Sequence, residues 1–540
     1  MHFKMNLHRY KPTWNWLPYL LLLPLMWLFW TTSVSTSWAR IASLQTIEPY
    51  AMAVHEQLMR NFAETGSFSQ TIHRGYDDAW TWSGHRALTL PIVGWIYGWN
   101  PSALWLSKIM IGWFVFGALG AGGIAMRHLQ SHWGFLWGGA VYLLMPATMA
   151  LSLQDYQDLC MALPCLVLAW NLLERGKWYW TVLAIFLAIA PREETVPMAF
   201  FCAVMARPML EGVWLRRAHA MNVGIAIALI AFYAWWANAY FPLNNGGHDM
   251  PLQNAMGSLG HERIFLEGWV YHTRFYALVF LPIGVLSYFA PLVGLPAVAL
   301  CLLHMSVPDG HGVDRSWSGH CHHMAPAVAF SCISAIIGGS RLANWLSIER
   351  FGRWKGLLPT ILLIGTISWS GWWWVQWADY YNLILTSTVQ EPEWEHPAWK
   401  LKEYLKEDEI LVVNKNTALV ASDQVRSYTL DESLYGKERR KGLGVADCAI
   451  IDRRRSDILQ RVMTMSPTLR AEEEQFQMWC WEKNTVDRFV MNQSRFKPAE
   501  PYTGPYKKGS DIPGTAPRES KIATPMGSFP VLNLRDWKIE

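Results

Sequence analysis

Residues 103–126 read ALWLSKIMIGWFVFGALGAGGIAM, a run in which Lys108 is the only charged side chain. A helix needs about 20 apolar residues to cross a bilayer, so this run predicts a transmembrane helix. The other apolar runs predict a mainly α-helical, polytopic membrane bundle with about eleven crossings. They lie near residues 17–30, 133–153, 159–173, 178–190, 194–206, 218–241, 275–289, 291–305, 324–339 and 357–377.

Several of these runs are too short to cross a bilayer as one straight helix. Pro191 and Pro291 are among the prolines that mark candidate breaks. A backbone break at membrane depth is tolerated only inside protein or beside a water-filled cavity. We therefore expect some short or re-entrant helices around a polar cavity.

The composition supports a membrane protein. Hydrophobic residues make up 52% of the chain and charged residues 16%, whereas soluble domains average about 25% charged. The chain also carries 33 Trp, a residue that favours the membrane–water interface. A net charge of +4, with its basic residues beside apolar runs, argues against a nucleic-acid partner.

Basic loops predict the orientation, because short cytoplasmic loops are enriched in Lys and Arg. With eleven crossings, the basic N-terminal tail and the loops near 127, 174–177, 207–217 and 341–355 share the cytoplasmic side. We expect an integral protein of a bacterial cytoplasmic (inner) membrane. Its transmembrane domain covers residues 1–378, with a first outer loop at about 34–86, and its C-terminal domain is extracytoplasmic.

Residues 379–540 form this second domain, which has no long apolar run. Strands are predicted at 410–413, 427–430 and 449–451, a short helix at 417–424 and a last strand at 529–534. Alternating strands and helices indicate a small α/β domain. A Pro/Gly-rich loop is predicted near 497–521. Cys448 and Cys480 can pair if the domain lies outside the cytoplasm, or stay free.

The candidate site residues are ionisable groups at the edges of apolar runs. Charge near bilayer depth is costly, so such groups are candidates for function. On the predicted outer side they are Glu48, Asp77, Asp78, His85, Asp155, Asp158, Arg192, Glu193 and Glu194. One of these carboxylates can act as a general base and another can hold Mg²⁺ or Mn²⁺. Arg192 can neutralise a phosphate.

Each candidate also has a structural alternative. Asp155 and Asp158 can cap a helix, and Asp77 and Asp78 can be solvated loop residues. Arg192 can form an ion pair with a neighbouring Glu, and Glu48 can be an ordinary polar residue at the membrane interface.

A further group comprises His304, His311, His320, His322 and His323 with Asp309 and Asp314. Its spacing fits no standard zinc signature, so a surface loop or a substrate contact is favoured over a metal site.

The order of these motifs resembles a bacterial family of multi-pass membrane proteins of unknown function. That family in turn resembles the GT-C class of polyprenyl-phosphate-sugar-dependent glycosyltransferases. The likeness covers residues 40–455 and rests on four places: IEPYAMAVHEQL around Glu48, GHRALTLPIVGWIY around His85, QDYQDLCMALP, and PREETVPMA. The family usually shows Asp at the position of Glu48 and Lys at that of Arg192.

The resemblance and the clustering of carboxylates together imply sugar transfer from a polyprenyl-phosphate carrier to an extracytoplasmic saccharide, lipid or protein acceptor. Glu48 would be the catalytic base, supported by Asp77 or Asp78. His85, Asp155, Asp158, Arg192, Glu193, Glu194 and His323 would bind substrate. One alternative is a non-catalytic subunit that binds a partner through an exposed surface at Trp479–Trp481. A transporter ranks third, because no related halves are detectable.

Overall fold

The computed structural model describes residues 16–44, 49–66, 68, 72, 87–240, 284–306, 322–347, 357–381, 396–406, 409–424, 427–429, 446–463 and 466–481. The chain divides into two compact units. The first comprises Met1–Val34, Gly84–Leu90 and Lys108–Val375, and the second comprises Ser35–Ser83, Pro91–Ser107 and Gln376–Glu540. The predicted division at residues 378 and 379 remains a prediction.

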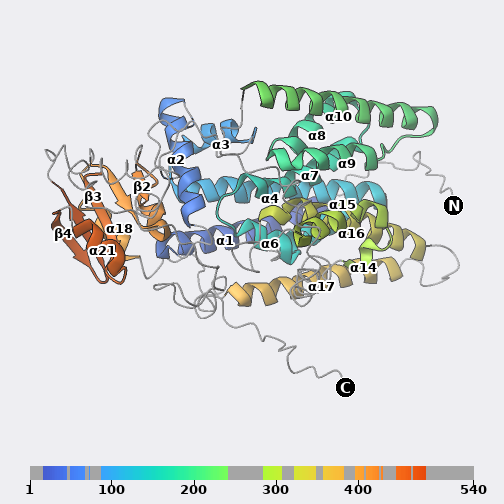
Figure 1. Cartoon of the computed structure of the whole chain (residues 1–540). Coiled ribbons are helices and arrows are strands. Elements are labelled where there is room, and N and C mark those ends of the chain that lie inside the picture. The colour runs from blue at the N-terminus through green and yellow to red at the C-terminus, as the bar shows by residue number, and fades with distance from the viewer. Residues whose placement is uncertain are drawn as a thin grey trace, which may run out of the picture. The chain divides into compact units, whose positions relative to one another are not determined.

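The first unit is helical (Figure 1). Three of its helices, α1 (Leu17–Ser43), α4 (Ala103–Leu129) and α17 (Leu357–Tyr381), extend into residues of the second unit. The remaining elements are α5 (Trp133–Leu144), α6 (Pro146–Ser152), η2 (Asp158–Met161), α7 (Ala162–Leu173), α8 (Trp178–Ile189), η3 (Glu193–Thr195), α9 (Val196–Met205), α10 (Gly212–Tyr240), α14 (Gly284–Ser287), α15 (Pro291–Ser306), η4 (His322–Met324) and α16 (Ala325–Leu346).

Four of the described helices, α1, α4, α10 and α16, are long and apolar enough to cross a membrane. The pair α5 and α6 makes a fifth candidate, bent by 60° at a break before Pro146. Shorter apolar helices include α7 and α8. These helices identify an integral membrane protein, and the short and broken elements match the pattern expected from the sequence. The number of eleven crossings remains a prediction.

Helix α16 lies at the centre of this unit, with 89% of its most apolar 18-residue stretch buried. It packs against α7, α14 and α15. A Cβ atom at Gly338 would lie 1.9 Å from the carbonyl oxygen of Leu286, so only glycine permits this approach. Small residues allow such close helix packing where no hydrophobic effect drives helices together in lipid.

One buried ion cluster joins two loops that the sequence assigns to the same side of the membrane. The Arg127 guanidinium donates to the Glu174 carboxylate at 2.7 and 3.1 Å. Trp170 Nε1 donates to the same carboxylate at 2.8 Å, and His128 Nε2 lies 2.9 Å from it. The buried charge of Glu174 is thus paired with Arg127 and hydrogen-bonded on both oxygens, which fits a structural role.

The second unit contains α2 (Pro49–Thr65), α3 (Leu90–Tyr97), α18 (Pro397–Lys402), η6 (Lys415–Ala421) and α21 (Ser456–Met463). Its sheet has the order β2-β1-β3-β5-β4, with strands Ser427–Thr429, Leu411–Val413, Cys448–Asp452, Phe476–Cys480 and Thr468–Glu473. The strands β2, β1 and β3 are parallel, and β5 joins them antiparallel. The three predicted strands at 410–430 and 449–451 are present; the predicted strand at 529–534 and the loop at 497–521 lie outside the described residues.

Alternating side chains pack on opposite faces of this sheet. Leu411, Val413 and Ile450 contact α18 and η6 in one core, whereas Val412 and Ala449 contact α21 in the other. The expectation of an exposed surface at Trp479–Trp481 is wrong, because Trp481 is 7% exposed and Trp479 packs against the second core. Both rings pack with the core that also contains Ile458 and Val462 of α21.

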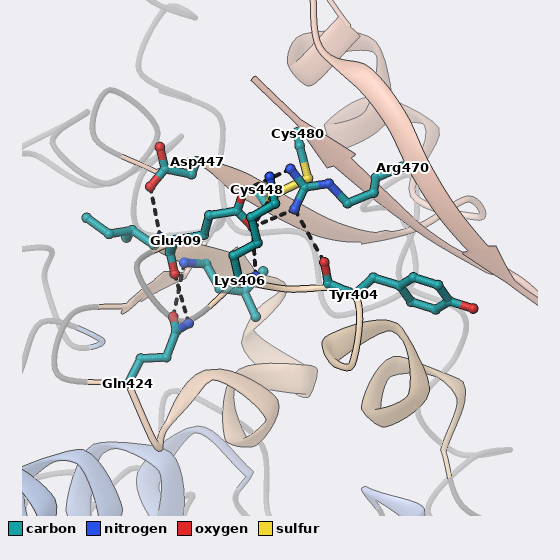
Figure 2. Close-up of a disulfide and its surroundings, with 10 residues drawn as sticks. Tyr404, Lys406, Glu409, Gln424, Asp447, Cys448, Arg470 and Cys480 are labelled. Carbon is teal, nitrogen blue, oxygen red and sulfur yellow. Dashed lines mark hydrogen bonds and ion pairs between the residues drawn. A yellow bond between two sulfur atoms is a disulfide. The ribbon is translucent and has the colours of Figure 1, made fainter. Parts of the chain in front are cut away.

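A disulfide joins Cys448 and Cys480, which lie directly opposite each other on β3 and β5. Figure 2 shows Glu409 and Arg470 beside this bond. The Arg470 guanidinium donates to both oxygens of Glu409, at 2.5 and 2.8 Å. This hydrogen bonding holds the pKa of Glu409 below its usual range.

Candidate anion site at three helix starts

Three short 3-10 turns, η2, η3 and η4, lead directly into α7, α9 and α16. Prolines favour these starts, because Pro197 and Pro326 occupy the first turns of α9 and α16, where a missing N–H costs nothing. The first turn of a helix presents unpaired N–H groups and a partial positive charge. The turns η2 and η4 contact each other, so two of these starts are adjacent.

Arg192 lies between α8 and η3 and is buried, with 4% of its surface exposed. Its backbone is held by Thr195, whose N–H and hydroxyl both donate to the Arg192 carbonyl, at 3.0 and 2.7 Å. Its Nη1 lies 4.0 Å from Asp158 Oδ1, and its Nε lies 3.9 Å from Glu194 Oε1. These separations are too long for hydrogen bonds.

The guanidinium consequently has more N–H donors than acceptors within hydrogen-bond distance. Within the described residues, its buried Nε and Nη1 have no hydrogen-bond partner. A buried polar group of this kind costs about 1–3 kcal/mol, and more when it is charged, so each one requires an explanation. An anion between Arg192 and the helix starts would supply the missing acceptors.

Carboxylates border this guanidinium. Asp158 is 1% exposed, and its Oδ1 accepts the N–H of Leu159 at 2.8 Å while Oδ2 is buried with no partner among the described residues. Glu194 Oε2 lies 3.5 Å from His323 Nδ1 on η4. Contacts among Asp158, Arg192, Glu194 and His323 therefore join η2, η3 and η4.

An apolar groove runs along the helices next to η3. It has a volume of about 430 Å³ and is lined by Val196, Pro197 and Phe200 of α9 with Ile227, Ile230, Ala231 and Ala234 of α10. Val196 directly follows η3, so one end of the groove adjoins the turn that holds Glu194. The lining residues of α10 have the spacing of one helix face.

The structure brings together four residues that the sequence predicts as substrate-binding, namely Asp158, Arg192, Glu194 and His323. Asp155 is buried three positions before Asp158, and Glu193 is half-buried beside Arg192. The predicted residues Glu48, Asp77, Asp78 and His85 lie outside the described part of the chain.

Sequence reasoning missed Thr195 and the groove. A Thr two positions before a Pro at a helix start is a recognisable signal, as is the apolar spacing of residues 227, 230, 231 and 234. That spacing identifies one apolar face of a helix but does not identify what lies against it.

The described residues contain no group of three or more His, Cys, Asp or Glu side chains placed to hold a metal ion. The predicted Mg²⁺ or Mn²⁺ therefore has no ligand set within this part of the chain. Of the His-rich segment, only the side chain of His323 is described. We assign no step to a metal.

No protein-family model matches this sequence, and no curated protein matches it. The chain is similar in structure to ArnT from Cupriavidus metallidurans bound to undecaprenyl phosphate, with a TM-score of 0.53 and 12% identity over 86% of this chain and 98% of that chain. It is also similar to ArnT in the apo state, with a TM-score of 0.51 and 12% identity over 87% and 98% of the two chains. The predicted resemblance to GT-C polyprenyl-phosphate-sugar glycosyltransferases is thereby confirmed as a likeness of fold.

Proposed function

We propose that this protein is a membrane glycosyltransferase that moves a sugar from a polyprenyl-phosphate carrier to an acceptor on the extracytoplasmic side. One observation carries the proposal: a buried guanidinium, whose Nε and Nη1 have no hydrogen-bond partner among the described residues, lies at clustered helix starts next to an apolar groove. The guanidinium and the N–H groups at the helix starts are suited to bind a phosphate, and the apolar groove is suited to bind a hydrocarbon chain.

The chemistry explains why a phosphate needs this environment. The acceptor oxygen or nitrogen forms a bond to the anomeric carbon of the sugar, and the bond from that carbon to the phosphate oxygen breaks. The departing polyprenyl phosphate gains one negative charge. Arg192 is held in place by Thr195 and excluded from water, so it can stabilise that charge without reorganising.

The carboxylates beside Arg192 have a complementary role in the proposal. Asp158 and Glu194 lie near enough to orient the guanidinium, yet too far to occupy its donors. His323 holds Glu194 from the opposite turn. A phosphate can then enter without displacing an existing hydrogen bond of Arg192 Nε or Nη1.

The acceptor must lose a proton, and we assign that step to Glu48, with Asp77 or Asp78 in support. Carboxylates serve as general bases when they reach the acceptor group. The assignment rests on the sequence resemblance, because these residues lie outside the described part of the chain. Asp155 and Glu193 are proposed to contact the sugar or its phosphate.

The lipid carrier is proposed from the groove and from the fold. The groove is lined entirely by apolar side chains, and a similar structure, ArnT, is bound to undecaprenyl phosphate. Such a carrier belongs in a bacterial cytoplasmic membrane. The disulfide supports placing the second unit outside the cytoplasm, because these bonds persist in oxidising compartments.

The test is sugar transfer in membranes that contain the full chain. Membranes receive undecaprenyl-phosphate-linked pentoses and hexoses carrying a radiolabel, and label is followed into saccharide, lipid and protein fractions. We expect Arg192→Gln to lower transfer by at least about 100-fold, as removal of one charge-stabilising donor does in other sites. Arg216→Gln is the matched control, because Arg216 is exposed on α10. Equal transfer by wild type and R192Q would refute the proposal.

A further inference from the structure

The second unit contains a cavity that the proposed phosphate site does not use. It has a volume of about 300 Å³ and lies among the end of α1, helix α2, the start of α4, and the segments α18 and η6. This volume is at the lower end of the ~300–1,000 Å³ range of small-molecule sites. It accommodates one ring-sized group.

Two carboxyl groups and two cations face this cavity. Glu56 is 3% exposed and accepts hydrogen bonds from Ser422 Oγ and from Tyr97 OH, the latter at 3.3 Å. Lys402 forms an ion pair with Asp423, and Arg60 donates to the Pro101 carbonyl at 3.4 Å. Each cation has a carboxylate partner, Lys402 in Asp423 and Arg60 in Glu64 at 3.3 Å, so the lining selects neither a phosphate nor a simple cation.

Unused hydrogen-bonding atoms remain in this lining. Within the described residues, the buried Nε of Arg60 and the buried Oδ1 of Asp423 have no hydrogen-bond partner. One is a donor and the other an acceptor, so they match a ligand that both accepts and donates. A hydroxyl group does both.

Aromatic rings form the remaining wall. Trp38 and Trp399 both line the cavity. The Trp399 Nε1 donates to the Ile41 carbonyl at 3.2 Å, and Lys402 lies 5.4 Å from the ring centre, so the indole is held in place. A fixed ring offers a large apolar contact area beside polar groups.

We infer that this cavity binds one uncharged saccharide unit, a ring that combines hydroxyl edges with apolar C–H faces. The Trp rings would contact the C–H faces, and Arg60, Asp423 and Glu56 would bind hydroxyl groups. As an acceptor subsite the inference rests on the proposed function, whereas binding itself can be measured independently.

The experiment uses the full chain in nanodiscs of phosphatidylethanolamine and phosphatidylglycerol, without glycoside detergents. The probes are the methyl glycosides of glucose, galactose, mannose and N-acetylglucosamine, followed by saturation-transfer NMR. We expect at least one to bind wild type and to bind Trp399→Ala about tenfold more weakly. Trp99→Ala is the matched control, because Trp99 is 64% exposed and does not line the cavity.

A second variant guards against misfolding of W399A. Ala42→Leu places a larger side chain in the cavity while keeping a good helix former in α1, and it should abolish binding. Absence of binding to wild type by every glycoside, or unchanged binding in A42L, would overturn the inference. A tenfold preference for glucosamine or glucuronate over the methyl glycosides would overturn the argument from paired charges.

Arg192→Gln separates this inference from the proposed function. The inference predicts that R192Q binds the glycoside normally while losing polyprenyl phosphate. Loss of saccharide binding alone in W399A and A42L, with normal binding of undecaprenyl phosphate, supports two independent sites. Wild type that binds the lipid phosphate but none of the glycosides would refute only the saccharide site.

Discussion

The Cys448–Cys480 disulfide should be a large contributor to the stability of the second unit. The bond links residues 32 positions apart, and the closed segment contains α21 and β4. Loop-closure entropy for this span corresponds to about 3.7 kcal/mol at 25 °C. The double variant Cys448→Ala/Cys480→Ala should lose about this amount of unfolding free energy.

The assay is urea-dependent proteolysis of the full chain in nanodiscs, with peptides from residues 446–481 followed by mass spectrometry. The control is Cys202→Ala, which removes a buried free thiol of α9. Alkylation before and after reduction reports the bond itself. In protein from a host with an oxidising envelope, both thiols should react only after reduction.

Two results would refute this reasoning. If the double variant resists proteolysis as well as wild type, the bond contributes little to the stability of the sheet. If both thiols react without reductant in protein from an oxidising host, the bond does not form. The second result would also remove the support for an extracytoplasmic second unit.

Three further predictions concern single carboxylates. Burial raises the pKa of Glu56 from its ordinary 4.5 to about 7, so the folded protein keeps a proton that the unfolded chain releases. The free energy of unfolding should therefore fall by about 3 kcal/mol as pH rises from about 4.5 to about 7, and Glu56→Gln should remove that fall in pH-dependent urea unfolding. Arg470 lowers the pKa of Glu409, so this carboxylate stabilises the fold above its unfolded pKa and that stabilisation is lost as pH falls. Glu409→Gln should lower the free energy of unfolding by about 2 kcal/mol at pH 7 in the same assay, and an unchanged value would contradict the bidentate pair. Glu48→Gln should lower sugar transfer at least about 100-fold, and undiminished transfer would remove Glu48 from the mechanism.

The sequence was most informative where a single pattern decides a structure. Apolar length predicts the membrane helices, and Pro191 coincides with the break after α8. The break before Pro146 was not predicted, because residues 133–153 read as one apolar run. Strands β1 and β3 are short apolar runs with no polar alternation because both faces are covered. The hairpin of β4 and β5 was missed, because Thr468–Glu473 carries three charged residues and has no fully buried position.

The candidate site could be predicted only as a list of residues. The cost of burying charge singled out Asp158 and Arg192, but their contact depends on the meeting of η2 and η3, which are separated by α7 and α8. Glu56 was overlooked because it lies on the amphipathic helix α2, where an acidic residue normally faces water. Its burial depends on Ser422, which lies 366 positions away in the sequence.

The proposed function depends on Arg192 holding the phosphate of a polyprenyl carrier. The most direct measurement is native mass spectrometry of the full chain with undecaprenyl phosphate, with undecaprenol and dioleoyl phosphatidic acid as competitors that each lack one half of the ligand. We expect wild type and Arg216→Gln to retain undecaprenyl phosphate, and Arg192→Gln to bind it at least about tenfold more weakly. Neither competitor should displace it at equal concentration. Equal retention by wild type and R192Q, or displacement by phosphatidic acid alone, would refute this role of Arg192.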